Sequence, residues 1–370
     1  MNDPRALGLA AADADVAARV AATVRAEIRA LAAYSVAKAE GMIKLDAMEN
    51  PYALPADVRE RLASALAEVP INRYPDGGAD SVKRALRASL ALSDDVALMA
   101  GNGSDEVLQI ITAAVAKPGA AVIAPEPSFV MYRLYAVYAN ARYIAVPLRD
   151  EFSLDIDSML ATIERERPAL VWIAYPNNPT GNLFDAGDVE RIIRAAPGLV
   201  VVDEAYYAYA DRSFLPRVLE FDNLIVVRTV SKIGMAGLRL GYAVAHPAWI
   251  AELEKVRPPY NVNALTQAAV PLLLAERALL DGEAIAIRAE RARLATALST
   301  MPDVVVHPTA TNFVLARFPD GNATFAALRD AHILVKNLHG WHPLLANCLR
   351  ITVGTPIEND ALLKALRETS

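Results

Sequence analysis

The pattern of apolar and polar residues divides most of the chain into four regions. Residues 13–33 have apolar positions at helical spacing, which predicts an amphipathic N-terminal helix. From about 96 to 246, short apolar runs alternate with helical stretches, as a doubly wound sheet requires. Residues 247–301 are predicted to be mostly helical, and residues 303–368 mix short strands with two helices. The sequence therefore predicts an α/β fold with a large, mostly parallel, doubly wound sheet and a smaller α+β domain.

Polar side chains stand at or just beyond the predicted carboxyl ends of four apolar runs in the central region. These residues are Ser104, Asn178, Asp203 and Lys232. Each has an ordinary explanation when taken alone: a helix cap, an Asn-Pro turn, an ion pair or a solvated lysine. Because ligands bind outside the carboxyl ends of the strands in parallel α/β sheets, the four together predict one shared crevice.

Lys232 is the most informative of these residues. It follows the apolar run of residues 224–230 and stands among small and hydroxyl-bearing residues. A buried ammonium must be paired, or its pKa falls from about 10.4 toward neutrality. An amine with a lowered pKa can attack a carbonyl group and hold a Schiff base. Residues 98–106 add a glycine-rich turn that leads into a helix, and such a helix start suits a phosphate group.

The segments GNGSDE, YPNNPTG, VDEAYY and RTVSKIGMAGLRLGY resemble those of fold-type-I, class-II-like aminotransferases that use pyridoxal phosphate (PLP). The resemblance narrows to the histidinol-phosphate aminotransferases at MENPYALP (48–55), NRYPDGG (72–78), TNFVLARF (311–318) and CLRITVGT (348–355). Matching segments cover nearly the whole chain. The resemblance implies an N-terminal arm at 1–43 that packs with the small domain, a large PLP-binding domain at 44–280 and a small domain at 281–370.

The resemblance also assigns roles around the cofactor. Lys232 is implied to form the internal aldimine and then to move the proton between substrate and cofactor carbons. Asp203 is implied to pair with the pyridine nitrogen, while Tyr206 and Asn178 hydrogen-bond the phenolic oxygen and Phe129 stacks on the ring. The residues implied to hold the cofactor phosphate are Gly103, Ser104, Asp105, Thr229, Ser231, Arg239 and, from the neighbouring subunit, Tyr74.

Substrate recognition requires cations, because histidinol phosphate has a phosphate and L-glutamate has two carboxylates. Arg350 matches an arginine of the family, and its planar guanidinium suits both groups. Lys336 stands where many relatives have a second arginine, and the alternative for it is a solvated lysine on an edge strand. Tyr34 matches a tyrosine near the substrate phosphate, and Asn50 completes the expected substrate contacts.

Composition agrees with an enzyme of this class. The chain has 370 residues and can bury a large core. Its net charge of −6, without a dense basic run, disfavours nucleic acid and anionic membranes as partners. The apolar runs are shorter than the ~18 residues that span a bilayer, and residues 1–12 do not resemble a signal peptide. A lone cysteine, Cys348, cannot form an internal disulfide, so we expect a cytoplasmic protein.

Two histidines invite a metal hypothesis, which the sequence does not support. His339 and His342 flank Gly340-Trp341 in a predicted loop. No third ligand stands nearby, and a zinc site of the kind that histidines form has three or four protein ligands. We therefore predict no metal.

The sequence thus predicts a homodimeric enzyme with shared active sites. It would interconvert L-histidinol phosphate plus 2-oxoglutarate and imidazole acetol phosphate plus L-glutamate in histidine biosynthesis, by a ping-pong mechanism. An aromatic amino-acid aminotransferase and a phosphothreonine-type decarboxylase of the same fold are the alternatives. A regulatory protein of this fold would need an additional DNA-binding domain, and the residues before Tyr34 are too few and insufficiently basic for one.

Overall fold

The computed structural model describes residues 15–33 and 37–368. Contacts divide the chain into two units, residues 1–38 and residues 39–370. In the first unit, residues 15–23 and α2 (Ala26–Arg29) are helical. The helix predicted over 13–33 is therefore interrupted at residues 24–25, and its first two residues lie outside the described part of the chain.

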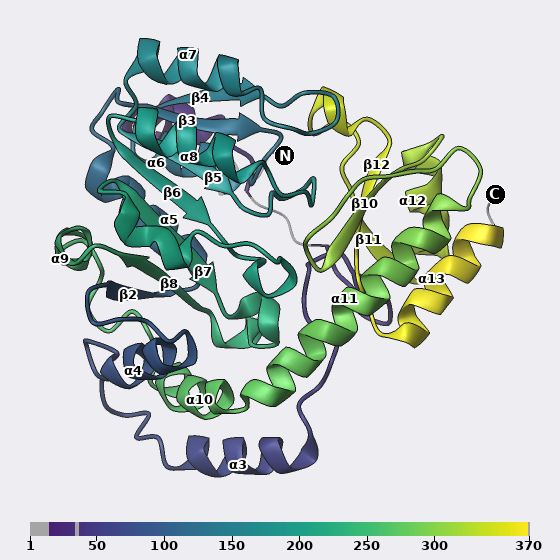
Figure 1. The fold of residues 1–370 in the computed structure, drawn as a ribbon, viewed down its shortest axis with the longest axis horizontal. Coiled ribbons are helices and arrows are strands. Elements are labelled where there is room, and N and C mark those ends of the chain that lie inside the picture. The colour runs from purple at the N-terminus through teal and green to yellow at the C-terminus, as the bar shows by residue number, and fades with distance from the viewer. Residues whose placement is uncertain (1–14, 34–36, 369–370) are drawn as a thin grey trace, which may run out of the picture. The chain divides into compact units, whose positions relative to one another are not determined.

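The second unit contains a seven-stranded sheet with the order β2-β8-β7-β6-β5-β3-β4 (Figure 1). Its strands are β2 (Ala97–Asn102), β3 (Ala121–Glu126), β4 (Arg142–Pro147), β5 (Leu170–Ala174), β6 (Leu199–Asp203), β7 (Leu224–Thr229) and β8 (Leu240–Ala245). Neighbouring strands are parallel except where β8 pairs with β2 and β7. The predicted mostly parallel sheet is confirmed.

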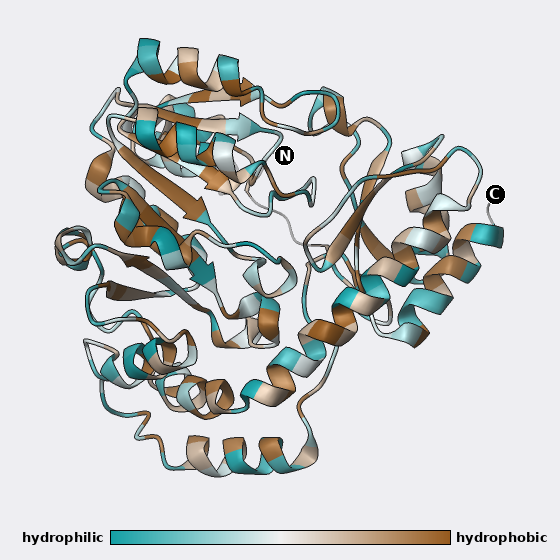
Figure 2. Cartoon of the chain, viewed as in Figure 1, coloured by the Kyte–Doolittle hydropathy of each residue, from teal (hydrophilic) through white to brown (hydrophobic). Residues whose placement is uncertain are grey.

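Helices cover both faces of this sheet. On one face lie α5 (Ser104–Val115), α6 (Met131–Tyr138) and α9 (Pro247–Glu254); on the other lie α4 (Asp80–Ser89), α7 (Ile156–Glu166), α8 (Ala186–Ala195) and α10 (Ala264–Ala275). Because side chains alternate along a strand, Val200 and Val202 pack on the second face and Val201 on the first. Strands buried on both faces read as continuous apolar runs, and Figure 2 shows the central strands in brown.

A smaller, five-stranded sheet has the order β1-β11-β12-β10-β9. Its strands are β1 (Ile43–Leu45), β9 (Val305–Val306), β10 (Phe313–Arg317), β11 (Ile333–Asn337) and β12 (Cys348–Thr352). It packs with α11 (Arg277–Ser299), α12 (Gly321–Asp330) and α13 (Pro356–Glu368) around its own apolar core. The predicted α+β arrangement is confirmed, and β1, which the sequence pattern did not predict, joins it from far along the chain as a parallel partner of β11. Helix α3 (Ala56–Ala67) follows β1 and contacts α10.

The large sheet also contains a buried ion pair. Arg228 on β7 and Glu204, just after β6, are joined by bonds of 2.9 and 2.8 Å from Nε and Nη2 to one carboxylate oxygen. The Arg228 guanidinium also lies 4.0 Å from the ring centroid of Tyr207. These contacts compensate the cost of burying both charges.

The arrangement of the strands creates one polar edge. Strands β2, β5, β6 and β7 run in the same direction, so their carboxyl ends meet at the same edge of the sheet. Beyond β7 the chain makes two short 3₁₀ helices, Ser231–Ile233 and Ala236–Leu238, before returning as β8.

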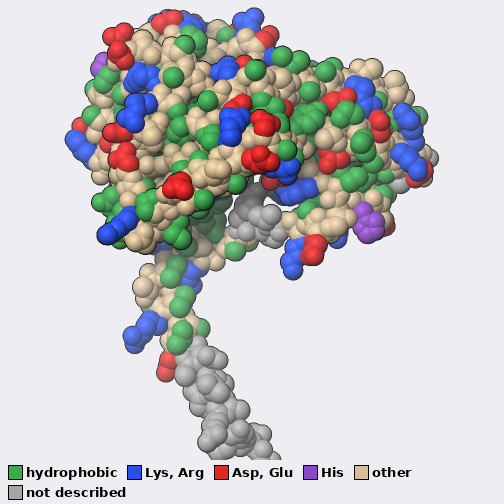
Figure 3. All heavy atoms as spheres, turned by 90° about the horizontal axis from the view of Figure 1, so that it is seen from below, with side chains coloured by type: hydrophobic (Ala, Val, Ile, Leu, Met, Phe, Trp, Pro, Cys, Tyr) green, Lys and Arg blue, Asp and Glu red, His purple; other side chains and the backbone are tan. Residues whose placement is uncertain are grey.

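The described surface is mixed in charge. On the face shown in Figure 3, basic and acidic side chains are interspersed among apolar and polar ones. No helix in the described ranges has both the length and the apolarity to cross a bilayer.

Candidate active site

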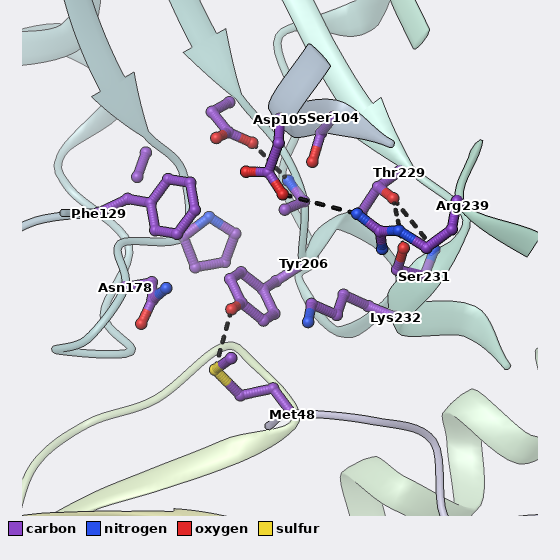
Figure 4. A pocket seen from close by; sticks show the side chains of 14 residues that line it. Met48, Ser104, Asp105, Phe129, Asn178, Tyr206, Thr229, Ser231, Lys232 and Arg239 are labelled. Atoms are coloured by element: carbon purple, nitrogen blue, oxygen red, sulfur yellow. Dashed lines mark hydrogen bonds and ion pairs between the residues drawn. The ribbon is translucent and has the colours of Figure 1, made fainter. Parts of the chain in front are cut away.

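A cleft of about 590 Å³, including its opening to solvent, lies at the polar edge of the large sheet (Figure 4). It brings together ten of the residues that the sequence predicted for the site. They are Ser104, Asp105, Phe129, Asn178, Asp203, Tyr206, Thr229, Ser231, Lys232 and Arg239. Met48, Ala174, Pro176 and Ala205 complete the lining. The space is large enough for a small aromatic molecule.

One end of the cleft is built to bind an anion. Helix α5 begins at Ser104, so its free backbone N–H groups and its dipole face the cleft. Arg239 lies above this helix start, with its Nη2 3.6 Å from an oxygen of Asp105. The hydroxyl oxygens of Thr229 and Ser231 lie 2.9 Å apart and add further donors. Helix amides, two hydroxyls and a guanidinium are the groups that hold a phosphate.

Two glycines allow this end of the cleft to form. Gly103 has φ +84°, and a Cβ on it would lie 2.6 Å from Nη2 of Arg239. Gly241 on β8 passes so close to the helix start that a Cβ there would lie 2.2 Å from the backbone nitrogen of Ser104. Since any side chain at these positions would fill the anion site or displace the helix, the glycines of GNGSDE and LGY are required by geometry.

Asp203 is a buried acid without a basic partner. Its carboxylate accepts hydrogen bonds from the hydroxyl of Tyr132 at 2.9 Å and from the backbone N–H of Ala205 at 3.1 Å. Burial raises the pKa of Asp203 to about 6, against these two bonds, which lower it. No lysine or arginine in the described ranges forms an ion pair with it. A cation placed in the cleft would therefore stabilise the ionised carboxylate and lower its pKa.

Lys232 is the amine of the site. Its Nζ donates to the carbonyl oxygen of Ala47 at 3.2 Å and lies 5.9 Å from the ring centroid of Tyr206. Burial, helped by the positive charge of Arg350, lowers the pKa of Lys232 to about 8. The lowered pKa gives the amine a larger neutral fraction at neutral pH than a solvated lysine has, as a nucleophile or base requires.

Tyr206 and Phe129 form the aromatic walls of the cleft. The buried Tyr206 hydroxyl donates to the Sδ atom of Met48 at 3.2 Å, and burial raises the pKa of this phenol. Met48 has φ +55°, and its backbone is fixed by bonds to Thr352 and Asn312 of the small sheet region. The segment between β1 and α3 thus contributes one wall of the cleft.

Arg350 lies at the edge of the cleft beside Asn178. Its Nη1 donates to Oδ1 of Asn178 at 2.6 Å, and its Nη2 donates to the carbonyl oxygen of Asp46 at 3.0 Å. Lys336 stands directly across from Arg350 in the antiparallel pairing of β11 and β12. The two cations predicted for substrate binding are therefore neighbours, although neither is among the residues that line the cleft.

The structure places two other predicted residues away from the cleft and does not describe a third. Asn50 does not line the cleft; its side chain donates to Glu283 at 2.7 Å and accepts from the backbone of Tyr52. Tyr74 also lies away from the cleft of its own chain, where it is 82% exposed. Tyr34 lies outside the described residues.

The sequence did not predict two residues that the structure brings to the site. Tyr132 is in an apolar helix segment, MYRLYAVY, whose pattern indicates only packing. Met48 is the first residue of MENPYALP, a segment that was identified only for its resemblance to the family. Their roles depend on distant partners, so no local pattern marks them. Among the described residues, no group of three His, Cys, Asp or Glu side chains is placed to hold a metal ion.

The fold and the site together define a fold-type-I transferase. The structure matches that of a histidinol-phosphate aminotransferase from Sinorhizobium meliloti in complex with pyridoxal-5'-phosphate, with a TM-score of 0.82 and 27% identity over 94% of this chain and 97% of that one. The chain belongs to the aminotransferase class I and II family, whose model matches residues 40–366.

Curated relatives are much more similar in sequence. The chain is 53% identical over 344 residues to the histidinol-phosphate aminotransferase of Chromobacterium violaceum, covering 93% of this chain and 97% of that protein. It is 52% identical over 355 residues to histidinol-phosphate aminotransferase 1 of Ralstonia nicotianae, covering 94% and 95%.

Proposed function

We propose that this chain is a PLP-dependent aminotransferase that interconverts L-histidinol phosphate plus 2-oxoglutarate and imidazole acetol phosphate plus L-glutamate. The observation that carries the proposal is the convergence on one cleft of an amine with a lowered pKa, a buried acid without a cation, and an anion site. The similarity to the named relatives supports the choice of substrate.

The residues of the cleft fit the cofactor. Its phosphate suits the anion site at the start of α5, where Gly103 leaves room for it. A protonated ring nitrogen would supply the cation that Asp203 lacks. The aromatic walls of Phe129 and Tyr206 suit a planar ring.

Each residue then has a defined task. When bound, the cofactor supplies an electron sink for the bond that breaks at the amine-bearing carbon. Asp203 holds the proton on the ring nitrogen, which keeps the ring electron-withdrawing. Lys232 takes a proton at its Nζ and gives it back at a neighbouring atom, acting as base and then as acid. Tyr206, released from Met48, can turn its hydroxyl toward the cofactor oxygen.

Arg350 and Lys336 are the proposed substrate contacts. Both substrates of the reaction bring an anionic group, either the phosphate of histidinol phosphate or a carboxylate of glutamate. A guanidinium beside an ammonium attracts both groups, and a ping-pong reaction needs one site that accepts each substrate in turn. Tyr34 and Asn50 remain predicted contacts.

The first experiment is a single half-reaction. The purified, PLP-loaded protein is mixed with L-histidinol phosphate, and the absorption of the bound cofactor is followed. L-phenylalanine and L-threonine phosphate serve as parallel amines, and released carbon dioxide is measured in each mixture. We expect a rapid change with histidinol phosphate and no carbon dioxide. A preference for phenylalanine would move the substrate to aromatic amino acids, and carbon dioxide from threonine phosphate would indicate a decarboxylase.

We also propose a homodimer in which Tyr74 reaches the cofactor phosphate of the partner subunit. Tyr74 is stacked on Tyr260, with ring centroids 4.7 Å apart, and both are exposed. Ile71, nearby in the sequence, is 81% exposed. Apolar side chains presented in this way are typical of a protein–protein interface.

The shared site can be tested by mixing two inactive variants. Lys232→Ala removes the amine of one subunit, and Tyr74→Ala removes the predicted contribution to the other. If subunits exchange, a mixed dimer keeps one intact site and recovers part of the activity. No recovery, with exchange proven by differently tagged subunits, would contradict a shared site.

We further propose the domain division 1–43, 44–280 and 281–370, and a cytoplasmic location.

A further inference from the structure

Two cationic residues lie opposite each other on neighbouring strands of the small sheet. Lys336 on β11 and Arg350 on β12 are Cα partners in an antiparallel pairing. Like charges directly opposite one another destabilise a sheet. Among the described residues, the Lys336 ammonium has no side-chain hydrogen-bond or ion-pair partner; burial and the charge of Arg350 lower its pKa, against the smaller opposite effect of Asp46. The pairing therefore has a cost that a bound anion would remove.

An aromatic ring fixes the position of the Lys336 ammonium. Its Nζ lies 4.7 Å from the ring centroid of Trp341, within the range of a cation–π interaction. Trp341 is 51% exposed, so burial of its ring in an apolar core does not explain why a tryptophan stands at this position. Without the ring, the four-carbon stem of Lys336 could turn its charge away from Arg350 and into solvent.

The loop that bears Trp341 is itself held in place. Leu338 donates its backbone N–H to the carbonyl of Cys348 at 3.0 Å, and Trp341 donates its own to the carbonyl of Leu338 at 3.1 Å. Gly340 has φ +83°, which completes the tight turn. On the other side, Nδ1 of His339 contacts Asn347. The ring therefore belongs to a hydrogen-bonded loop tied to the strand of Arg350.

We propose that Trp341 is a positioning residue that holds the Lys336 ammonium beside Arg350, so that the site favours a doubly charged phosphate ester over a singly charged carboxylate. The inference rests on the proposed function, because it assigns the phosphate of the amine substrate to this pair. A second cation within reach adds more to the binding of a dianion than to that of a monoanion, since Coulomb attraction scales with the charge.

A double-mutant cycle tests whether Trp341 acts through Lys336. The variants are Trp341→Leu, Lys336→Met, the double variant and Trp341→Phe, which keeps an aromatic ring. The readout is the ratio of kcat/KM for L-histidinol phosphate to that for L-histidinol, which has the same amine without the phosphate. We expect Trp341→Leu to lower this ratio about threefold, from the usual strength of a cation–π contact. Lys336→Met should lower it about tenfold or more, from the loss of a charged partner.

The double variant should lose no more than Lys336→Met alone, because Trp341 has nothing to position once the ammonium is gone. Trp341→Phe should keep most of the ratio. Losses of the two single changes that simply multiply, or a Trp341→Leu ratio equal to that of the unchanged protein, would overturn the proposal.

Binding of inorganic phosphate separates this inference from the proposed function. Calorimetry on the cofactor-loaded protein measures phosphate affinity without any turnover. We expect the affinities to fall in the same order as the ratios, with Trp341→Leu weaker than Trp341→Phe. If neither amine reacts but the order holds, the proposed substrate is wrong and the cation pair stands. If histidinol phosphate reacts but phosphate affinity is the same in all variants, the function stands and Trp341 has no such role.

Discussion

Replacing Tyr132 by phenylalanine removes one hydroxyl from the buried end of the site. That hydroxyl donates to the Asp203 carboxylate at 2.9 Å, and the rest of the side chain, which stacks on Trp172, is kept. A hydrogen bond to an ionised group stabilises it by about 1.5–3 kcal/mol, so its loss should raise the pKa of the carboxyl by roughly 1–2 units. From a starting value of about 6, the pKa of Asp203 would then lie at roughly 7–8.

The change in pKa translates into a change in cofactor affinity. At pH 7, a carboxyl with a pKa of 6 is about nine-tenths ionised, whereas one with a pKa of 7–8 is roughly one-half to one-tenth ionised. If the ionised form is the one that binds the protonated ring nitrogen, Tyr132→Phe should raise the dissociation constant about two- to tenfold at pH 7. The two proteins should converge near pH 9, where Asp203 is ionised in both.

Calorimetry with pyridoxamine phosphate between pH 6 and pH 9 measures this effect, because this form of the cofactor lacks the carbonyl that would react with Lys232. Other groups titrate equally in both proteins, so the ratio of the two dissociation constants isolates Asp203. Tyr138→Phe, the same change on an exposed tyrosine of α6, is the matched control and should leave the ratio near one. A constant ratio across the pH range would refute the argument.

Three further predictions follow from other parts of the structure. The pKa of Lys232 falls from 10.5 to about 8 on folding, so the unfolded chain binds this proton more tightly than the folded one. The free energy of unfolding of the cofactor-free protein, measured with urea and compared with that of Lys232→Met, should therefore rise between pH 8 and pH 10.5. Parallel plots of the free energy of unfolding against pH for the two proteins would contradict a buried amine. Arg228→Met leaves the buried Glu204 carboxylate without its cation and should lower the free energy of unfolding by about 3–5 kcal/mol. Arg217→Met removes a cation from an exposed pair and should lower it by about 1 kcal/mol or less, and equal losses in the two variants would argue against a buried pair. Gly103→Ala should weaken the binding of pyridoxamine phosphate much more than the binding of pyridoxamine. Gly119→Ala, at a glycine with a similar φ and open space around it, should strain the backbone without changing the affinity for either ligand. An equal loss of affinity for both ligands in Gly103→Ala would mean that the phosphate binds elsewhere.

The sequence alone determined the large sheet and most of the cleft. Runs such as 199–203 are apolar at every position because both faces of the sheet are covered, and this pattern is local. The polar residue that ends such a run must lie at the carboxyl edge, so Asp203 and Lys232 could be assigned to one site before any contact was known. Gly103 likewise predicts a turn before α5, since few residues other than glycine adopt its φ of +84°.

The tertiary structure decided which side chains touch. The bond from Arg350 to Asn178 joins residues 172 positions apart, and the bond from Tyr132 to Asp203 joins residues 71 positions apart. Likewise, β1 has only three residues and becomes a strand because β11 lies beside it. Hydrophobic periodicity records which face of an element is buried, but it does not record which distant element covers that face. The partners of Asp203, Met48 and Lys336 are set by that packing, and so are the charges and pKa values on which the chemistry of this protein depends.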